Sequence, residues 1–253
     1  MQPWVIFLDD GGVMNDNRLR GMQWQRLVGT FFAPRLGGAP ESWAEANRIF
    51  STQLFEPASW QARLAAARNY QSFAYTYYLD WVRSMCALVG VKAPGDEVCQ
   101  QLGIEAEDFI TPLVHAAIPG AVSAIRTLHR RGYQLHTASG EPSRSLAGYL
   151  QAMEIQECFQ GLYGPDLIDT FKIGSEYYTR IFAQVGIDPA TALVVDNDPL
   201  PIAWARQAGA RTAFVGEKLF AEAQIAAKDK TFSPGTDTIA SLADLPDFIE
   251  RLV

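Results

Sequence analysis

The sequence predicts an α/β fold: a Rossmann-like parallel sheet with helices on both faces, and an all-helical unit inserted after the first strand. Short apolar segments alternate with helical segments of about 10–15 residues in two parts of the chain. Residues 17–116 interrupt this alternation, because they contain helical patterns and no convincing strand. Of the 253 residues, 48% are hydrophobic and 19% are charged, which is typical of a globular protein with a sizeable core.

Five segments are predicted strands. Trp4–Leu8 is a continuous apolar run, as expected for a strand that is buried on both faces of a parallel sheet. The other four follow the helical insert: Tyr133–Thr137, a weaker one at Gly161–Tyr163, Ala192–Val195 and Thr212–Val215.

Four helices are predicted between the later strands: Ala121–Arg131, Pro142–Met153, Gly174–Val185 and Pro199–Ala208. Proline near the start and glycine just after the end of several of these segments favour helix termini at those places. Strands that alternate with helices of this length indicate βαβ units and therefore a parallel sheet.

The insert contains the longest predicted helix, from Ser59 to Val89, with Ser59 as its N-cap and Gly90 as its end. Its apolar residues recur at three- and four-residue steps and so form one stripe. The insert is rich in aromatic residues, which favours a packed helical bundle. We expect an α/β core domain of residues 1–16 and 117–253 and a helical cap domain of residues 17–116.

Charge and composition exclude several classes of partner and location. Lys plus Arg is 21 and Asp plus Glu is 28, so the net charge is −7, which disfavours nucleic acid or an anionic membrane as the main partner. No apolar run approaches the ~18 residues of a membrane span, and the first residues lack the pattern of a secretory signal, so we expect a cytoplasmic location. Three widely spaced cysteines without a CxxC pair indicate neither a disulfide framework nor a zinc site. The oligomeric state stays open.

Two acidic residues directly follow predicted strands: Asp9 after Trp4–Leu8, and Asp196 after Ala192–Val195. If these strands are neighbours, both carboxylates point into one crevice at the carboxyl edge of the sheet. Carboxylates about 5 Å apart repel by about 3 kcal/mol at an effective dielectric of about 20. The pair therefore calls for a cation, and oxygen ligands with room for water suit Mg²⁺. The alternative is that each residue only caps a turn.

Two more residues favour the functional interpretation. Thr137 ends a predicted strand, so we expect its hydroxyl to reach the same crevice, beside the amides that open the next helix and that suit an anion. Lys172 precedes the helix at Gly174 and supplies a fixed positive charge. A carboxylate nucleophile, a hydroxyl, a lysine and a metal-binding aspartate are together the groups that phosphoryl transfer needs.

The order of these residues resembles the haloacid dehalogenase (HAD) superfamily, particularly members with a helical C1-type cap after the first strand. The first motif of that family is a hydrophobic strand followed by Asp-x-Asp-Gly-[Thr/Val]. The matching segments here are Val5–Val13 (VIFLDDGGV), Leu135–Ser139 (LHTAS), Lys172, and Val194–Asp198 (VVDND). The match spans nearly the whole chain, with the cap matched only in position and helical character.

The resemblance implies a role for each matched residue. Asp9 is the expected nucleophile, which forms an aspartyl-phosphate that water then hydrolyses. Thr137, Ala138 and Lys172 are expected to bind the phosphoryl group of a small phosphorylated metabolite.

The resemblance also implies a metal site and a role for the cap. Asp196 is expected to bind Mg²⁺ together with Asp9 and the backbone carbonyl of Gly11. The cap is expected to close over the substrate and select it.

Gly11 departs from the family pattern, because phosphatases of this family usually carry a second aspartate there as general acid and base. General acid–base help contributes about 10²–10⁴-fold to the rate. Asp10 is adjacent, but neighbouring side chains near a strand end tend to point in opposite directions. Asp16 and His115 are the other candidates for the missing acid, although each also has a structural interpretation.

Smaller departures lie in the later motifs. Pro201 stands where many relatives carry a further acidic residue, which leaves Asp198 as the nearest candidate for an additional contact to the metal, either direct or through one of its ligands. Ile173 follows the lysine where proline is usual. We interpret His129 and His136 as packing or surface residues.

Three functions remain open at this point. The first is a Mg²⁺-dependent phosphatase. The alternative is a non-catalytic relative that binds a phosphorylated ligand or a protein partner, which Gly11 and Pro201 favour. A 2-haloacid dehalogenase is less favoured, because Arg18 and Arg20 lie near the cap entrance but the aromatic residue expected two positions after the nucleophile is absent.

Overall fold

The computed structural model describes residues 4–216 and 237–252. The chain forms two compact units. The α/β unit consists of Met1–Asn17, Ala116–Leu146 and Met153–Val253. The helical unit consists of Arg18–His115 and Ala147–Ala152.

The segment Ala147–Ala152 was expected in the α/β core, since it lies in a helix between two strands. Its contacts place it with the helical unit. Trp24 Nε1 donates a hydrogen bond of 2.6 Å to the hydroxyl of Tyr149, and a side chain on Gly148 would collide with Thr111 Oγ1. These contacts join residues far apart in the sequence, which is why periodicity alone assigns the segment to the other unit.

The α/β unit contains a six-stranded sheet in the order β3-β2-β1-β4-β5-β6, with all neighbouring strands parallel. Its strands are β1 (Val5–Leu8), β2 (Gln134–Ala138), β3 (Gly161–Tyr163), β4 (Ala192–Asp196), β5 (Arg211–Val215) and β6 (Asp237–Ile239). The predicted fold class is confirmed. The edge strand β6 was not predicted, since three residues with one apolar side chain give no strand signal.

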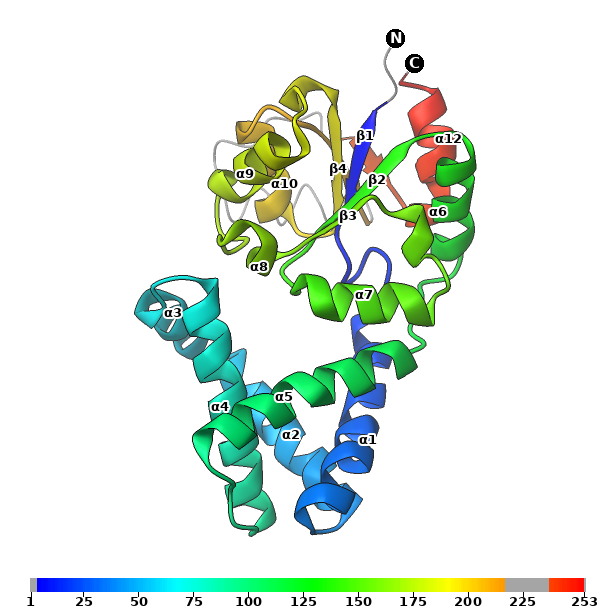
Figure 1. The fold of residues 1–253 in the computed structure, drawn as a ribbon. Coiled ribbons are helices and arrows are strands. Elements are labelled where there is room, and N and C mark those ends of the chain that lie inside the picture. The colour runs from blue at the N-terminus through cyan, green and yellow to red at the C-terminus, as the bar shows by residue number, and fades with distance from the viewer. Residues whose placement is uncertain (1–3, 217–236, 253) are drawn as a thin grey trace. The chain divides into compact units, whose positions relative to one another are not determined.

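Helices cover both faces of the sheet, with α6 and α12 on one side and α9 and α10 on the other (Figure 1). The bounds are α6 (Ala121–Arg130), α7 (Ser143–Ala152), α8 (Pro165–Ile168), α9 (Ser175–Val185), α10 (Pro199–Gln207) and α12 (Leu245–Glu250). Short 3₁₀ turns lie at Gln156–Cys158, Pro189–Thr191 and Leu242–Asp244. The four helices predicted between the strands are present to within one residue at each end.

The core of the α/β unit forms because the central strands are apolar on both faces. All residues of β1 and β4 are buried. Phe7 on β1 packs edge-on against Phe182 of α9, with ring centroids 5.2 Å apart. This packing holds α9 against the sheet and fixes the loop that precedes it.

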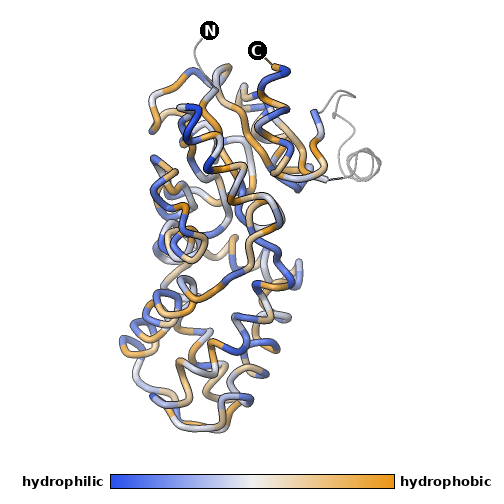
Figure 2. Tube along the Cα trace, turned by 90° about the vertical axis from the view of Figure 1, so that its right-hand side faces the viewer, coloured by the Kyte–Doolittle hydropathy of each residue, from blue (hydrophilic) through white to orange (hydrophobic). Residues whose placement is uncertain are grey.

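The helical unit contains α1 (Asn17–Leu36), α2 (Pro40–Leu54), α3 (Pro57–Ala66), α4 (Tyr70–Val89) and α5 (Asp96–Ile110), followed by a 3₁₀ turn at Thr111–Leu113. Hydrophobic and hydrophilic residues are interleaved along these helices, as amphipathic packing requires (Figure 2). Large aromatic side chains fill its core, including Trp43, Trp81, Phe31 and Phe32, each at most 1% exposed.

The single helix predicted from Ser59 to Val89 is wrong, because the chain breaks between α3 and α4. Asn69 starts a new helix there: its side chain accepts a 2.8 Å hydrogen bond from the Ser72 amide, and the Ser72 hydroxyl accepts from the Asn69 amide. This capping box stabilises a helix start within the apolar stripe. Gly90 ends α4 in a left-handed conformation, as predicted.

No helix among the described residues is both long and apolar enough to cross a bilayer. The three cysteines, Cys86, Cys99 and Cys158, are buried free thiols.

Candidate active site

The carboxyl ends of β1 and β4 bring Asp9 and Asp196 together. These strands are neighbours in register, with Leu8 beside Val195, and the Asp9 amide donates a 3.0 Å hydrogen bond to the Val195 carbonyl. The sheet order reverses between β1 and β4, since β2 and β3 extend to one side and β5 and β6 to the other. This is the place where parallel α/β sheets bind ligands.

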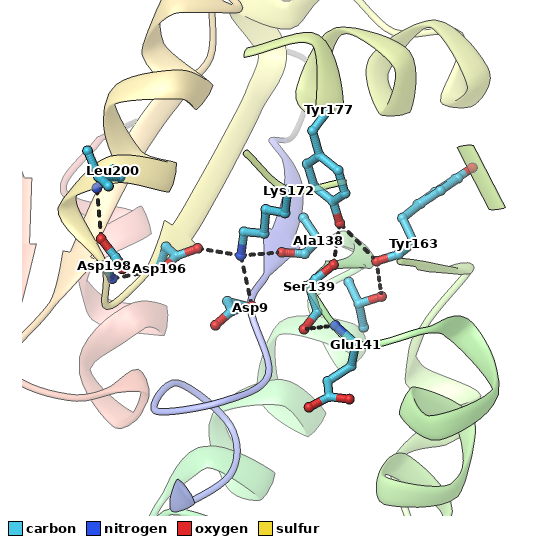
Figure 3. Close-up of polar contacts among 11 residues, drawn as sticks. Asp9, Ala138, Ser139, Glu141, Tyr163, Lys172, Tyr177, Asp196, Asp198 and Leu200 are labelled. Atoms are coloured by element: carbon cyan, nitrogen blue, oxygen red, sulfur yellow. Dashed lines mark hydrogen bonds and ion pairs between the residues drawn. The ribbon is translucent and has the colours of Figure 1, made fainter. Parts of the chain in front are cut away.

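Lys172 joins the two carboxylates (Figure 3). Its Nζ lies 2.8 Å from Asp9 Oδ1, 2.7 Å from Asp196 Oδ2 and 2.8 Å from the Ala138 carbonyl oxygen. An ammonium group has three N–H donors, so this arrangement uses all of them. The structure therefore brings together three of the predicted site residues, which are separated by up to 187 positions in the chain.

The cluster is shielded from water. The side chains of Asp9, Lys172 and Asp196 are 12%, 8% and 2% exposed. Burial opposes the charge on Lys172, but Asp196 and Asp9 outweigh this effect and hold its pKa well above the usual value. Burial raises the pKa of Asp196 to about 7, although Lys172 acts against this shift. Two carboxylates share one ammonium, so the ionised cluster carries one net negative charge and favours a further cation.

Asp196 is held by the start of α10. Its Oδ1 accepts a 2.8 Å hydrogen bond from the Asp198 amide, and Asp198 Oδ1 in turn accepts from the Leu200 amide at 2.9 Å. Asp198 was the candidate for an additional metal contact. Its amide contacts Asp196, as expected for an indirect role through a candidate ligand, while its carboxylate caps α10.

Thr137 does not reach the strand end, contrary to the expectation from the sequence. Strand β2 continues through Ala138, and Thr137 is fully buried within it. Its hydroxyl donates a 3.2 Å hydrogen bond to the Tyr163 carbonyl on β3. Ala138 contributes its carbonyl to Lys172.

The hydroxyl directly after β2 belongs to Ser139, which lies in the predicted motif but was not among the predicted site residues. Ser139 Oγ accepts a 3.2 Å hydrogen bond from the Glu141 amide, and its carbonyl accepts a 2.7 Å bond from the Tyr177 hydroxyl (Figure 3). Gly140 is an exposed residue, and its amide has no acceptor among the described residues. A serine directly before a glycine was the available signal, because glycine marks the turn that ends the strand.

The turn after β1 occupies Asp10 and the residues that follow. The Asp10 carboxylate is buried and accepts a 2.7 Å hydrogen bond from Asn15 Nδ2. Gly11 pairs with Asn15, and Gly12 adopts a φ of +84° where a side chain would collide with Asn197. Asp10 therefore stabilises the turn.

The other candidates for the missing acid also make main-chain contacts. The Asp16 amide donates to the Ala116 carbonyl at 2.8 Å within the α/β unit. His115 is exposed in the helical unit, where the Gln23 side chain binds both its N–H and its C=O.

Arg20, which was considered for the dehalogenase alternative, lies in the helical unit. Its guanidinium is 5.3 Å from the centroid of the Tyr149 ring.

The residues fit Mg²⁺ by the chemistry of their donors. Within the described ranges no group of three or more His, Cys, Asp or Glu side chains is placed to hold a metal ion. Asp9 and Asp196 offer two carboxylates within reach of the same point, the Lys172 ammonium. Mg²⁺ commonly binds through one or two carboxylates and completes its shell with water and phosphate oxygens. Two carboxylates are therefore enough for this cation.

The family of the chain follows from a comparison with known proteins. A family model described as "haloacid dehalogenase-like hydrolase" matches residues 29–209, well over half of the chain. The chain therefore belongs to the haloacid dehalogenase-like hydrolases.

Individual relatives are more distant. The chain is 27% identical over 95 residues to phosphoglycolate phosphatase 1 of Pseudomonas aeruginosa, a match that spans 38% of this chain and only 35% of that protein. Its structure is similar to L-2-haloacid dehalogenase from Xanthobacter autotrophicus, with a TM-score of 0.62, 14% identity and full coverage of both chains. It is also similar to a magnesium-bound HAD hydrolase of Bacillus subtilis, with a TM-score of 0.61, 14% identity and coverage of 98% and 99%. At these identities the structural matches establish the fold.

Proposed function

We propose that the protein is a Mg²⁺-dependent phosphatase that hydrolyses a small phosphate monoester through an aspartyl-phosphate on Asp9. The observation that carries this proposal is the buried cluster of Asp9, Lys172 and Asp196 at the point where the strand order reverses. The partial match to a phosphoglycolate phosphatase and the magnesium-bound structural relative support it.

In the proposed reaction Asp9 attacks phosphorus. Its Oδ1 is held by Lys172, while its Oδ2 has no hydrogen bond among the described residues and serves as the nucleophile. The new O–P bond forms as the bond from phosphorus to the leaving oxygen breaks. The leaving alkoxide takes a proton from water, since Gly11 offers none. A second water then hydrolyses the aspartyl-phosphate, which releases inorganic phosphate and restores Asp9.

The phosphoryl oxygens are bound at the end of β2 in this proposal. The Ser139 hydroxyl and the Gly140 amide are donors there, and they take the role that was expected of Thr137. Hydrogen bonds to a charged oxygen contribute about 1.5–3 kcal/mol each, so this loop can make a large part of the binding energy.

Asp9, Asp196 and the Gly11 carbonyl would hold Mg²⁺. When bound, the metal neutralises the negative charge of the phosphoryl group and of the carboxylates. Lys172 fixes the direction of the Asp9 carboxylate.

A substrate panel with and without Mg²⁺ tests the proposal. We expect release of inorganic phosphate that a chelator abolishes and that Asp9→Asn reduces by at least about 10³-fold, because the amide is a poor nucleophile. Asp188→Asn is the matched control, since that exposed aspartate caps a 3₁₀ turn and asparagine caps equally well. Equal phosphate release by the wild type and Asp9→Asn would reject the mechanism.

Gly11 favours one second candidate, a relative that binds a phosphorylated ligand without turnover. Phosphate esters would then raise the melting temperature, by an amount equivalent to about 2.7 kcal/mol at 100 times Kd, and no phosphate would be released. Chloride release from 2-chloropropionate in the presence of a chelator would instead indicate dehalogenase chemistry.

A further inference from the structure

Two consecutive carbonyls at the end of β2 accept hydrogen bonds from side chains of one short segment. Lys172 Nζ donates to the Ala138 carbonyl at 2.8 Å, and the Tyr177 hydroxyl donates to the Ser139 carbonyl at 2.7 Å (Figure 3). The β2–β3 ladder ends at Ala138 and Tyr163, so the Ser139 carbonyl has no strand partner. A buried carbonyl in that position needs another donor.

We propose that Tyr177 is a positioning residue, whose hydroxyl sets the orientation of the peptide between Ser139 and Gly140 and thereby directs the Gly140 amide toward the phosphoryl group. This inference rests on the proposed function. It deepens that function by adding a residue from the first turn of α9 that touches neither substrate nor metal.

Peptide geometry connects the two atoms. A trans peptide is planar, and its C=O and N–H point in opposite directions. The Ser139 carbonyl points toward Tyr177, which is fully buried, so the Gly140 N–H points away from α9. Gly140 is exposed, nothing beyond its chain neighbours lies within 4 Å of where its Cβ would stand, and its amide has no acceptor among the described residues.

The Tyr177 proton belongs to the Ser139 carbonyl rather than to the Tyr163 carbonyl. The hydroxyl lies 3.4 Å from the Tyr163 oxygen, which already accepts from the Thr137 hydroxyl and the Ser139 amide at 3.2 Å each. Among the described residues Tyr177 is the one donor to Ser139 O. Loss of its hydroxyl therefore leaves that carbonyl without a partner.

The rest of the loop is anchored independently. The Ser143 amide donates to Asp166 Oδ1 at 2.8 Å, and the Ser143 hydroxyl donates to the other oxygen of the same carboxylate. The backbone at Gly164 also passes so close to the Glu141 carbonyl that no side chain fits between them. Removal of the Tyr177 hydroxyl should therefore release one peptide and leave the course of the loop unchanged.

The next residue provides a matched control. Tyr178 is as deeply buried as Tyr177 and lies beside it on α9, with ring centroids 5.2 Å apart. Its hydroxyl has no hydrogen-bond partner among the described residues. Tyr177→Phe and Tyr178→Phe thus remove the same atom from neighbouring positions, and only the first removes a hydrogen bond.

The experiment is a titration of the ¹⁵N-labelled full-length protein with inorganic phosphate and Mg²⁺, followed through the Gly140 amide resonance. For Tyr177→Phe we expect the Kd for phosphate to rise about three- to tenfold, which is the effect of one displaced hydrogen bond. The KM for p-nitrophenyl phosphate should rise by a similar factor, with kcat changed by less than about twofold. Tyr178→Phe should match the wild type in both readouts.

The outcomes separate this inference from the proposed function. If the Gly140 resonance and the phosphate Kd are unchanged in Tyr177→Phe, or change equally in both variants, the positioning role is rejected. If wild-type turnover does not depend on Asp9, the phosphatase proposal is rejected. The peptide orientation is then still tested by comparing the Gly140 resonance of Tyr177→Phe, Tyr178→Phe and the wild type without phosphate. If Tyr177→Phe does not fold, the wild-type protein provides the test. Phosphate bound to the Gly140 amide must then shift the Tyr177 resonances, and unchanged Tyr177 resonances reject the positioning role.

Discussion

The hydroxyl side chains of Thr137, within β2, and Ser139, directly after it, have different hydrogen bonds and therefore different expected roles. Thr137 donates to a neighbouring carbonyl inside the sheet, whereas Ser139 lies at the strand end and its carbonyl is held by Tyr177. Both point to the same face by strand alternation, so the alternation of side chains does not distinguish them. The hydrogen bonds do.

Substitution of each hydroxyl tests this assignment. We expect Ser139→Ala to lower kcat/KM about 10- to 100-fold, because it removes a donor to a charged phosphoryl oxygen. Thr137→Val should stay within about threefold of the wild type, since the Tyr163 carbonyl keeps the Ser139 amide as a donor. Steady-state kinetics measures both values. A larger loss of kcat/KM in Thr137→Val than in Ser139→Ala would assign phosphoryl binding to Thr137.

The burial of His136 makes the stability of the folded protein depend on pH. It is 4% exposed and stacks on Phe7 with ring centroids 5.2 Å apart, and neither ring nitrogen has a well-formed hydrogen bond among the described residues. Burial lowers the pKa of His136 to about 4, and the Gly161 main chain opposes only part of that shift. Of the two roles expected for this histidine, packing or surface, the structure shows packing.

The folded protein therefore keeps His136 neutral where the unfolded chain binds a proton. Its contribution to stability is complete above pH 6.5 and is lost as the pH falls toward 4, by about 3 kcal/mol in total. Urea unfolding at pH 7 and pH 4 should show this loss in the wild type and in His129→Gln, an exposed control. The same acid-dependent loss in His136→Leu would assign it to other groups.

Close contact between α1 and α2 makes one glycine of α1 necessary and leaves the other replaceable. Helix α1 contains Gly21 and Gly29. A side chain on Gly29 would begin 2.3 Å from the Pro40 carbonyl oxygen at the start of α2, whereas Gly21 has no neighbour within 4 Å. The sequence shows two equivalent helical glycines, and only the packing of α1 on α2 separates them.

Alanine at each position should have opposite effects. We expect Gly29→Ala to lower the free energy of unfolding by about 1–3 kcal/mol, because the backbone of α2 must move. Gly21→Ala should raise it by about 0.5–1 kcal/mol, since alanine restricts the unfolded chain and favours helix. Denaturant unfolding measures both, and equal effects would contradict the contact at Pro40.

The absence of a side chain at Gly11 affects the whole reaction. In the proposed phosphatase reaction the leaving group departs with little help without the second aspartate, so aryl phosphates should react much faster than alkyl phosphates. Gly11 has no left-handed φ, so an aspartate is compatible with its backbone.

We expect Gly11→Asp to narrow the ratio of aryl to alkyl kcat/KM by up to about 10²–10⁴-fold. Gly12→Asp is the contrasting variant, because a side chain there is strained and collides with Asn197. Similar rates on both ester classes in the wild type would show that another group supplies the proton.

The amino-acid sequence alone determined the fold class, five of the six strands nearly to their ends, and the cluster of Asp9, Lys172 and Asp196. It did so because apolar runs that end in acidic residues are local signals, and because parallel strands must share one carboxyl edge. Tertiary structure decided which hydroxyl stands at the end of β2, where the helix after Ser59 breaks, and which unit includes Ala147–Ala152. These features depend on hydrogen bonds and contacts between distant residues, which no periodicity records.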